Sequence, residues 1–179
     1  RSGYSRERGP RPGSLRRRRW FHDWAVDRAL TLNPSFARGW RVSGLLRIFA
    51  GQHDLAIEHI ETSLRLSPRE RRGQTLTHIG RAYFFTHRFD EALSKLLLAS
   101  QDNPGLPGTD RFLAACYAHM GRLEEARAIA ARLCLITPEV VPSNLPWRNP
   151  DDRELLLSGL RLAMGEAEWA VTAWNRRPD

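Results

Sequence analysis

The fold is decided by residues 40–68, which read WRVSGLLRIFAGQHDLAIEHIETSLRLSP. A first apolar stretch contains the small residue Gly44, a turn residue follows at Gly51, and a second apolar stretch contains Ala56 and ends at Pro68. Within both stretches apolar residues recur at spacings near three and four, as they do on one face of an amphipathic helix. The segment therefore predicts two antiparallel helices joined by a short turn.

The same pattern recurs along the chain with a nearly constant period. Prolines stand at Pro34, Pro68, Pro104 and Pro138, so that successive prolines are 34, 36 and 34 residues apart. Because proline cannot extend a helix, each is expected just beyond a helix end. The small, turn and alanine positions repeat as Gly80, His87 and Ala92 and again as Ala114, Gly121 and Ala126. This repetition predicts stacked helix pairs, and hence an all-α solenoid.

Two further features support these helix pairs. Gly44 and Gly80 are expected where paired helices approach closely, since a larger side chain would push the partner away. Asp54 and Asp90 stand where second helices start and are predicted to act as N-caps. Glu124 and Glu125 favour the same end of the third pair, because acidic side chains stabilise a helix N-terminus.

The residues named above resemble tetratricopeptide (TPR) repeats, whose signature of tryptophan, glycine, alanine and proline is matched by Trp40, Gly44, Ala56 and Pro68. The resemblance implies an α-solenoid of three repeats, preceded by a half repeat at residues 20–34. We expect a disordered arginine-rich arm at 1–19, the solenoid at 20–138, and a proline-rich strap with a capping helix at 139–179. Leu155, Leu156, Leu160 and Met164 would form the apolar face of the capping helix, and Gly165 would end it.

The C-terminal region carries a second resemblance. Trp147–Glu154, followed by Ser158–Arg161, is similar to the C-terminal repeat region of bacterial class III adenylate or guanylate cyclase-like proteins of the kind found in rhizobia. In that family a cyclase or winged-helix domain precedes the repeats, so the resemblance implies the scaffold or regulatory part of a signalling protein. The chain starts at Arg1 instead of a methionine, which favours either a piece of a longer protein or an artefactual start. It offers no alternating strands for a cyclase domain, so we expect no catalytic residue.

Charge is concentrated at the N-terminus. The chain has a formal net charge of +8, and residues 1–19 contain eight arginines and one glutamate. Such an arm could contact phosphate backbones or acidic lipid. However, Lys95 is the only lysine in the chain, so the arginines also fit a general compositional bias. We therefore do not favour a nucleic-acid partner. With no apolar run long enough to span a membrane and no secretory leader, the expected location is the cytoplasm.

Other chemical sites are not indicated. The six histidines show no zinc-ligand spacing, and Cys116 and Cys134 are expected to pack as small apolar residues. Phosphate-loop, dinucleotide-binding and nucleophile motifs are absent from the sequence. We therefore expect no metal, no cofactor and no enzymatic activity.

A binding surface can be placed by analogy with solenoids in which the first helix of each pair lines a groove. Its outward residues are expected to be Arg38, Arg41, Phe49, Gln74, Thr77, Arg81, Phe85, Arg111 and His119. Arginines can hold carboxylates in bidentate pairs and phenylalanines can supply apolar anchors, so an acidic protein or peptide is the expected ligand. The alternatives are a solvated face or contact with a neighbouring domain of a parent chain.

The expected groove differs from the carboxylate clamps of other TPR proteins. Those clamps use paired asparagines, and here Leu45 and His78 stand at the corresponding positions. We therefore do not expect binding of chaperone tails. Three hypotheses compete: an interaction module of a cyclase-like protein or a stand-alone adaptor, an enzymatic parent chain, and nucleic-acid binding by the arm.

Overall fold

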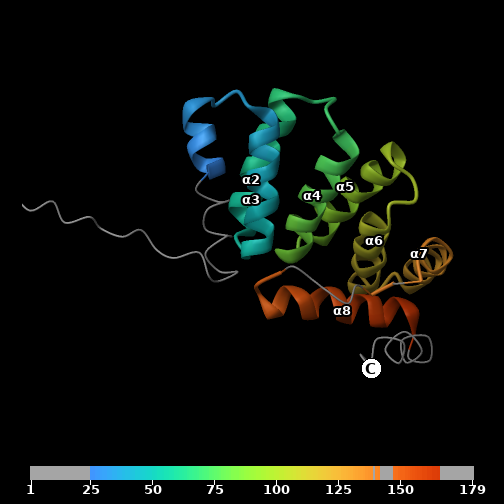
Figure 1. Ribbon diagram of the computed structural model, residues 1–179. Coiled ribbons are helices and arrows are strands. Elements are labelled where there is room, and N and C mark those ends of the chain that lie inside the picture. The colour runs from blue at the N-terminus through green and yellow to red at the C-terminus, as the bar shows by residue number, and fades with distance from the viewer. Residues whose placement is uncertain (1–24, 139, 142–146, 166–179) are drawn as a thin grey trace, which may run out of the picture.

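A computed structural model describes residues 25–138, 140–141 and 147–165, and these residues are helical throughout except for turns and short connections. Residues 25–32 form a first helical segment. The following helices are α2 (Ala37–Ala50), α3 (His53–Leu66), α4 (Arg72–Phe85), α5 (Phe89–Asp102), α6 (Pro107–His119), α7 (Leu123–Ile136) and α8 (Pro150–Met164) (Figure 1). The predicted all-α solenoid of helix pairs is confirmed. The predicted arm at 1–19 lies outside the described residues.

The helix ends match the proline period. Helices α3, α5 and α7 end at Leu66, Asp102 and Ile136, each two residues before one of the three later prolines. The first helical segment ends in the same way, two residues before Pro34. Since proline at these positions cannot continue a helix, it fixes the end of every second helix. None of the helices in the described ranges is long and apolar enough to cross a membrane.

Small residues hold the paired helices together. A Cβ atom added at Gly80 would lie 2.7 Å from Cγ of Leu96, and one added at Gly44 would overlap Ile60. Ala56 and Ala92, on the facing helices, are fully buried. The predicted close approach of the helices in the first two pairs is thus confirmed.

Each pair turns through a residue with left-handed backbone. Gly51 has φ 78°, Gly121 has φ 75°, and His87 has φ 59° at the equivalent place. Glycine adopts this conformation without steric cost, whereas histidine does not. The turn of the second pair is therefore strained relative to the other two.

The predicted capping role of two aspartates is wrong. Helix α3 begins at His53 and α5 at Phe89, and their N-cap residues, Gln52 and Arg88, make no side-chain capping hydrogen bond. Asp54 and Asp90 lie inside the first helical turn instead. The left-handed residue of each turn reverses the chain quickly enough for the helix to begin before the aspartate. The carboxylates can still favour the helix N-terminus electrostatically, as Glu124 and Glu125 do in α7.

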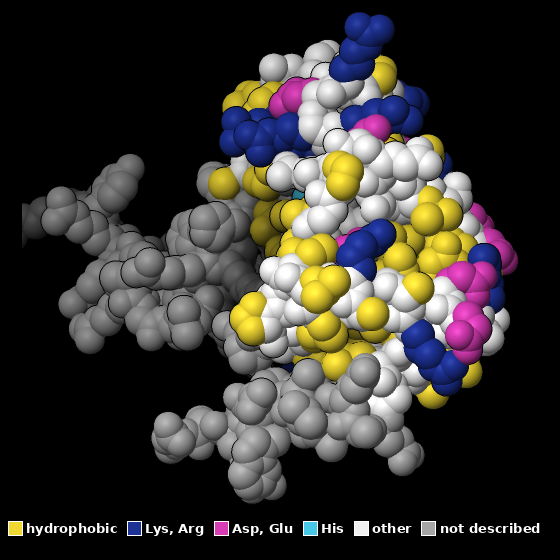
Figure 2. Space-filling model, turned by 90° about the vertical axis from the view of Figure 1, so that its right-hand side faces the viewer, with side chains coloured by type: hydrophobic (Ala, Val, Ile, Leu, Met, Phe, Trp, Pro, Cys, Tyr) yellow, Lys and Arg dark blue, Asp and Glu magenta, His cyan; other side chains and the backbone are white. Residues whose placement is uncertain are grey.

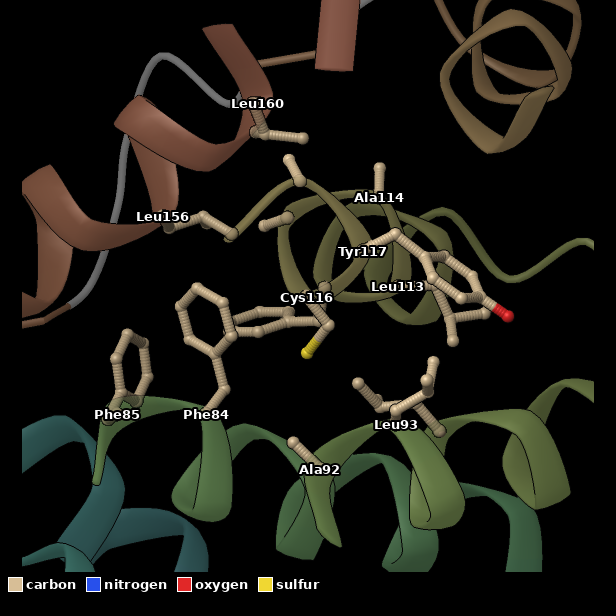
Figure 3. Close-up of a cluster of buried hydrophobic side chains, with 14 of the residues drawn as sticks. Phe84, Phe85, Ala92, Leu93, Leu113, Ala114, Cys116, Tyr117, Leu156 and Leu160 are labelled. Carbon is tan, nitrogen blue, oxygen red and sulfur yellow. The ribbon is translucent and has the colours of Figure 1, made fainter. Parts of the chain in front are cut away.

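One hydrophobic cluster runs from α2 to α8. Phe84 lies at its centre, fully buried, with its ring centroid 5.2 Å from that of Phe112 in an edge-to-face arrangement. Figure 3 shows side chains from α4, α5, α6 and α8 meeting there, with Leu156 and Leu160 entering from α8. Because these leucines are fully buried, α8 is part of the core and not a detachable appendage.

The stacking surface changes character at α7. The residue that follows the buried alanine of each second helix is Ile57 in α3 and Leu93 in α5, and both are buried by the next pair. In α7 the same position is Arg127, which is exposed and forms an ion pair with Glu124. A charged residue therefore stands in α7 where the first two pairs have an apolar one.

Helix α8 packs mainly on α6 and less on α7. It runs beneath the lower ends of the helix pairs instead of stacking beyond α7 (Figure 1). The contact is close because Gly159 presents no side chain: a Cβ there would lie 2.8 Å from Cβ of Ala115. The C-terminal helix was expected to cover the end of the solenoid. In the structure it covers the side formed by α6 and the lower turns.

Candidate functional site

The first helices of the three pairs, α2, α4 and α6, lie next to one another and form what we call the inner face. All nine predicted binding residues belong to these helices. The structure separates them into two groups. The described C-terminal residues cover one group and leave the other uncovered, while Thr77 and Arg81 pack between α4 and α6.

The covered group lies where residues 140–141 and 147–165 contact the inner face. The carbonyl oxygen of Val140 accepts a hydrogen bond from Nε of Arg111 at 2.7 Å. The Trp147 ring packs edge-on against Phe85, with centroids 5.2 Å apart. Nε2 of His119 lies 2.8 Å from the carbonyl oxygen of Leu155. Arg111, Phe85 and His119 therefore already have partners within the chain.

Thr77 is also closed to a partner. It is buried, and its hydroxyl donates to the carbonyl of Gly73 at 2.9 Å and lies 2.8 Å from the hydroxyl of Thr109. This pair joins α4 to α6. The expectation that Thr77 and Phe85 point outward needs correction, because neighbouring pairs stack closely enough to bury them.

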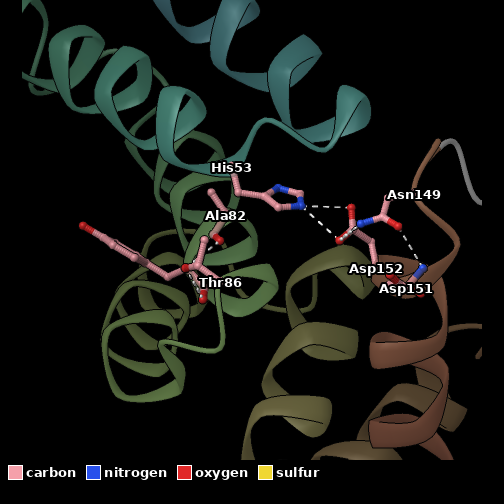
Figure 4. A network of polar contacts seen from close by, with 7 residues as sticks. His53, Ala82, Thr86, Asn149, Asp151 and Asp152 are labelled. Atoms are coloured by element: carbon pink, nitrogen blue, oxygen red, sulfur yellow. Dashed lines mark hydrogen bonds and ion pairs between the residues drawn. The ribbon is translucent and has the colours of Figure 1, made fainter.

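A buried polar contact fixes the start of α8 against the first pair. Nε2 of His53 lies 2.9 Å from Oδ2 of Asp152, and both side chains are almost fully buried. Asn149 caps α8 by accepting from the amide of Asp151 at 3.0 Å, and its Nδ2 donates to Asp152 at 3.2 Å (Figure 4). The amide of Arg148 donates to the carbonyl of Phe49 at 3.1 Å. Phe49 is thereby half-buried beside this contact.

The uncovered group lies toward the N-terminal ends of α2 and α4. Arg38 is exposed, Arg41 is largely buried, and Gln74 is half-buried with its Oε1 accepting from Arg71 at 3.3 Å. The pKa of Arg41 is lowered, first by burial and then by Arg71, while Glu70 acts in the opposite direction. Cations thus outnumber acids around Arg41.

Arg81 is the most unusual of the predicted residues. Its guanidinium Cζ lies 5.2 Å from the centre of the Phe112 ring, and its Nε is buried without a hydrogen-bond partner. Burial, with a smaller contribution from Arg111, lowers the pKa of Arg81 to about 10. Among the described residues no carboxylate forms an ion pair with Arg81. The arginine remains charged at neutral pH and has no acidic counterpart there.

Two residues beside Arg81 were not predicted as functional. His78 has a buried Nδ1 without a partner, and burial, Arg81 and Arg41 lower its pKa to about 3, so its ring is neutral at pH 7. A Cβ added at Gly108, in the first turn of α6, would lie 2.5 Å from Nη2 of Arg81. The sequence carried a weak signal for both. His78 stands where the carboxylate clamps of other TPR proteins have an asparagine, and a glycine within a helix often marks the close approach of another group to the backbone.

Positive charge also gathers outside the inner face. Figure 2 shows dark-blue side chains along the upper edge of the molecule with magenta side chains among them, and both kinds also occur lower down. A cleft of about 470 Å³ at this edge is lined by residues 69 and 71–74, around the start of α4, and by Asp102 and Asn103 at the end of α5. Asp102 lies 3.6 Å from Arg72, so the edge is partly neutralised. No group of three or more metal-ligating side chains occurs in the described part of the chain.

Comparison with known proteins bears on the fold. No protein-family model matches the sequence, and no curated protein matches it. A crystal structure of MamA superposes with a TM-score of 0.63 at 16% identity, covering 91% of this chain and 99% of that one. A second MamA structure, designated MSR-1 C2, gives 0.57 at 22% identity over 66% and 67% of the two chains.

A domain of a human protein also superposes on this chain. The first TPR domain of RPAP3 superposes with a TM-score of 0.54 at 20% identity, and the match covers 79% of this chain and 98% of that domain. Together with the confirmed helix pairs and the glycine and alanine contacts, these likenesses settle the architecture. The chain has the fold of TPR proteins.

Proposed function

We propose that the chain is a non-catalytic protein-interaction module that holds an extended, acidic segment of a partner on the uncovered part of the inner face. The single observation that carries this proposal is the unbalanced charge there. Arg71 and Arg38 lower the pKa of Arg41, and Arg81 and Arg41 lower the pKa of His78. Glu70 is the one acid that acts on Arg41, and it raises this pKa. Acidic side chains on a partner would supply the missing negative charge.

The covered part of the inner face limits where a partner can lie. Because Leu156 and Leu160 of α8 belong to the core, displacing α8 would expose fully buried apolar surface. The proposed ligand therefore lies beside the C-terminal segment, over α2 and along α4 as far as Arg81, instead of replacing that segment.

The partner segment belongs either to another protein or to a neighbouring domain of a parent chain. We further propose that the parent is a bacterial cyclase-like signalling protein of the cytoplasm, of which this chain is the scaffold or regulatory end. The support is the sequence resemblance of Trp147–Glu154 and Ser158–Arg161 alone. A stand-alone adaptor uses the same inner face and needs no cyclase.

A selection experiment tests the interaction module without knowledge of the partner. A display library of random dodecapeptides is selected on the full chain, and the bound peptides are mapped by hydrogen-exchange mass spectrometry. We expect enriched peptides to protect amides in α2 and α4. Protection confined to α3, α5 and α7, or no enrichment over an unfolded control, would contradict the proposal.

A further inference from the structure

We propose that Arg81 anchors a single carboxylate of the bound segment, in a site built by Phe112 and Gly108 and completed by the ligand. This inference rests on the proposed function, because it names the group that holds a partner on the inner face. It is narrower, since a partner could bind the same face without using Arg81.

The surroundings of Arg81 fix its orientation. The Phe112 ring supports one side of the guanidinium at 5.2 Å, and the absence of a side chain at Gly108 leaves room for Nη2. A guanidinium with these contacts has already lost much of its conformational freedom, so binding costs it little further entropy. The two Nη nitrogens, which make no hydrogen bond to described residues, can then donate in parallel to the two oxygens of a carboxylate.

A purely structural role does not account for this arrangement. A buried cation without an acidic partner disfavours the folded state, and an apolar side chain of similar length would fill the same space at no electrostatic cost. Elsewhere in the chain a half-buried arginine is paired: Nη2 of Arg47 lies 2.8 Å from both carboxylate oxygens of Asp27. The contrast indicates that the counter-charge of Arg81 comes from a ligand.

The neighbours of Arg81 favour a carboxylate. His78, neutral at pH 7, has an unused Nδ1 beside the cations. The nearby Arg111 adds positive potential, although its own Nε is engaged by Val140. The arrangement is not the asparagine-based clamp considered above, because the anchoring guanidinium rests on an aromatic ring and His78 occupies an asparagine position.

The test compares two arginine variants that remove the same charge. Fluorescence anisotropy follows a labelled (Ser-Glu)6 peptide, with its C-terminus amidated, binding to the full chain at about 150 mM salt, where long-range attraction is screened. We expect Arg81→Gln to weaken binding about 10- to 100-fold, the usual range for a lost charge-assisted hydrogen-bonded pair. Arg127→Gln, on the outer face of α7, should change affinity less than about 2-fold.

A second variant and two further peptides complete the test. Gly108→Ala places a methyl group where Nη2 of Arg81 lies and should weaken binding while Arg81 is retained. An amidated (Ser-Gln)6 peptide should not bind. If the same glutamine peptide with a free C-terminus does bind, the carboxylate is that of a chain end; if it does not, the carboxylate is that of a side chain.

The outcomes separate this inference from the proposed function. Equal affinities of the Arg81→Gln and Arg127→Gln proteins for the glutamate peptide would overturn the Arg81 site, as would binding that Gly108→Ala leaves unchanged. Displayed peptides that map to α2 and α4 but lack acidic residues would overturn it together with the acidic character of the proposed ligand, while the interaction module itself would stand. If no displayed peptide protects the inner face, both proposals fail.

Discussion

Replacement of Arg81 by methionine should make the ligand-free protein more stable. Methionine is unbranched and apolar, and it can occupy the space of the arginine stem against Phe112 without carrying a charge into the protein. Most substitutions of partly buried residues destabilise a fold. An increase in the free energy of unfolding would therefore be a specific consequence of the missing counter-charge.

The size of the effect follows from the electrostatics of the site. The pKa of Arg81 is lowered to about 10, and at roughly 1.4 kcal/mol per pKa unit the buried charge costs about 3 kcal/mol at neutral pH. Loss of the contact with the Phe112 ring offsets about 1 kcal/mol of this. The expected net gain is about 1–2 kcal/mol. The cost falls as pH rises through the folded-state pKa, because the neutral form then dominates in the protein.

Urea unfolding followed by circular dichroism measures this change. With a denaturant slope of about 2 kcal/mol per molar urea, the midpoint of Arg81→Met should rise by about 0.5–1 M. Arg47→Met is the matched control: its guanidinium is paired with Asp27, so the midpoint should fall. If both variants fall together, the charge of Arg81 is compensated within the fold and the argument for a ligand is wrong.

Three other predictions concern the fold. Gly80→Ala should lower the free energy of unfolding by about 1–3 kcal/mol, because the new Cβ would meet Leu96, and thermal unfolding checks this. His87→Gly should raise the free energy of unfolding by about 1 kcal/mol, because glycine adopts the left-handed backbone conformation without strain. A lowered melting temperature would show that His87 is not strained. A thiol reagent should modify Cys134, which is exposed. Cys116 should react only after unfolding, because burial raises the pKa of its thiol to about 12. Mass spectrometry that found both cysteines modified in the native state would contradict this prediction.

The solenoid could be predicted from sequence because its constraints are local and repeated. A proline two residues beyond a helix, a small residue at a helix crossing and a left-handed turn each have one favoured residue type, and the repeats show them several times. The N-cap predictions at Asp54 and Asp90 failed because helix starts depend on turn geometry. A shift of one residue there leaves the apolar pattern unchanged.

The inner face was harder to predict for a physical reason. Periodicity shows which side of α4 faces the neighbouring first helices, but it does not show what else packs there. Phe85 was placed on an open groove, and Trp147, far away in sequence, covers it. That Arg81 has no acidic partner among the described residues likewise depends on packing between helices far apart in the sequence. The sequence predicted that Arg81 belongs to the binding surface and could not indicate its burial.

If Arg81 anchors the ligand, a carboxylate of the ligand contacts its guanidinium group. The most direct measurement is the NMR resonance of the Arg81 Nε–H group, which Arg81→Gln identifies by its disappearance, followed during titration with the glutamate peptide. Because this Nε is buried, its proton should exchange slowly enough to observe near neutral pH. We expect a saturable shift with the same dissociation constant that anisotropy gives. A resonance that stays in place while other signals of the inner face move would contradict it.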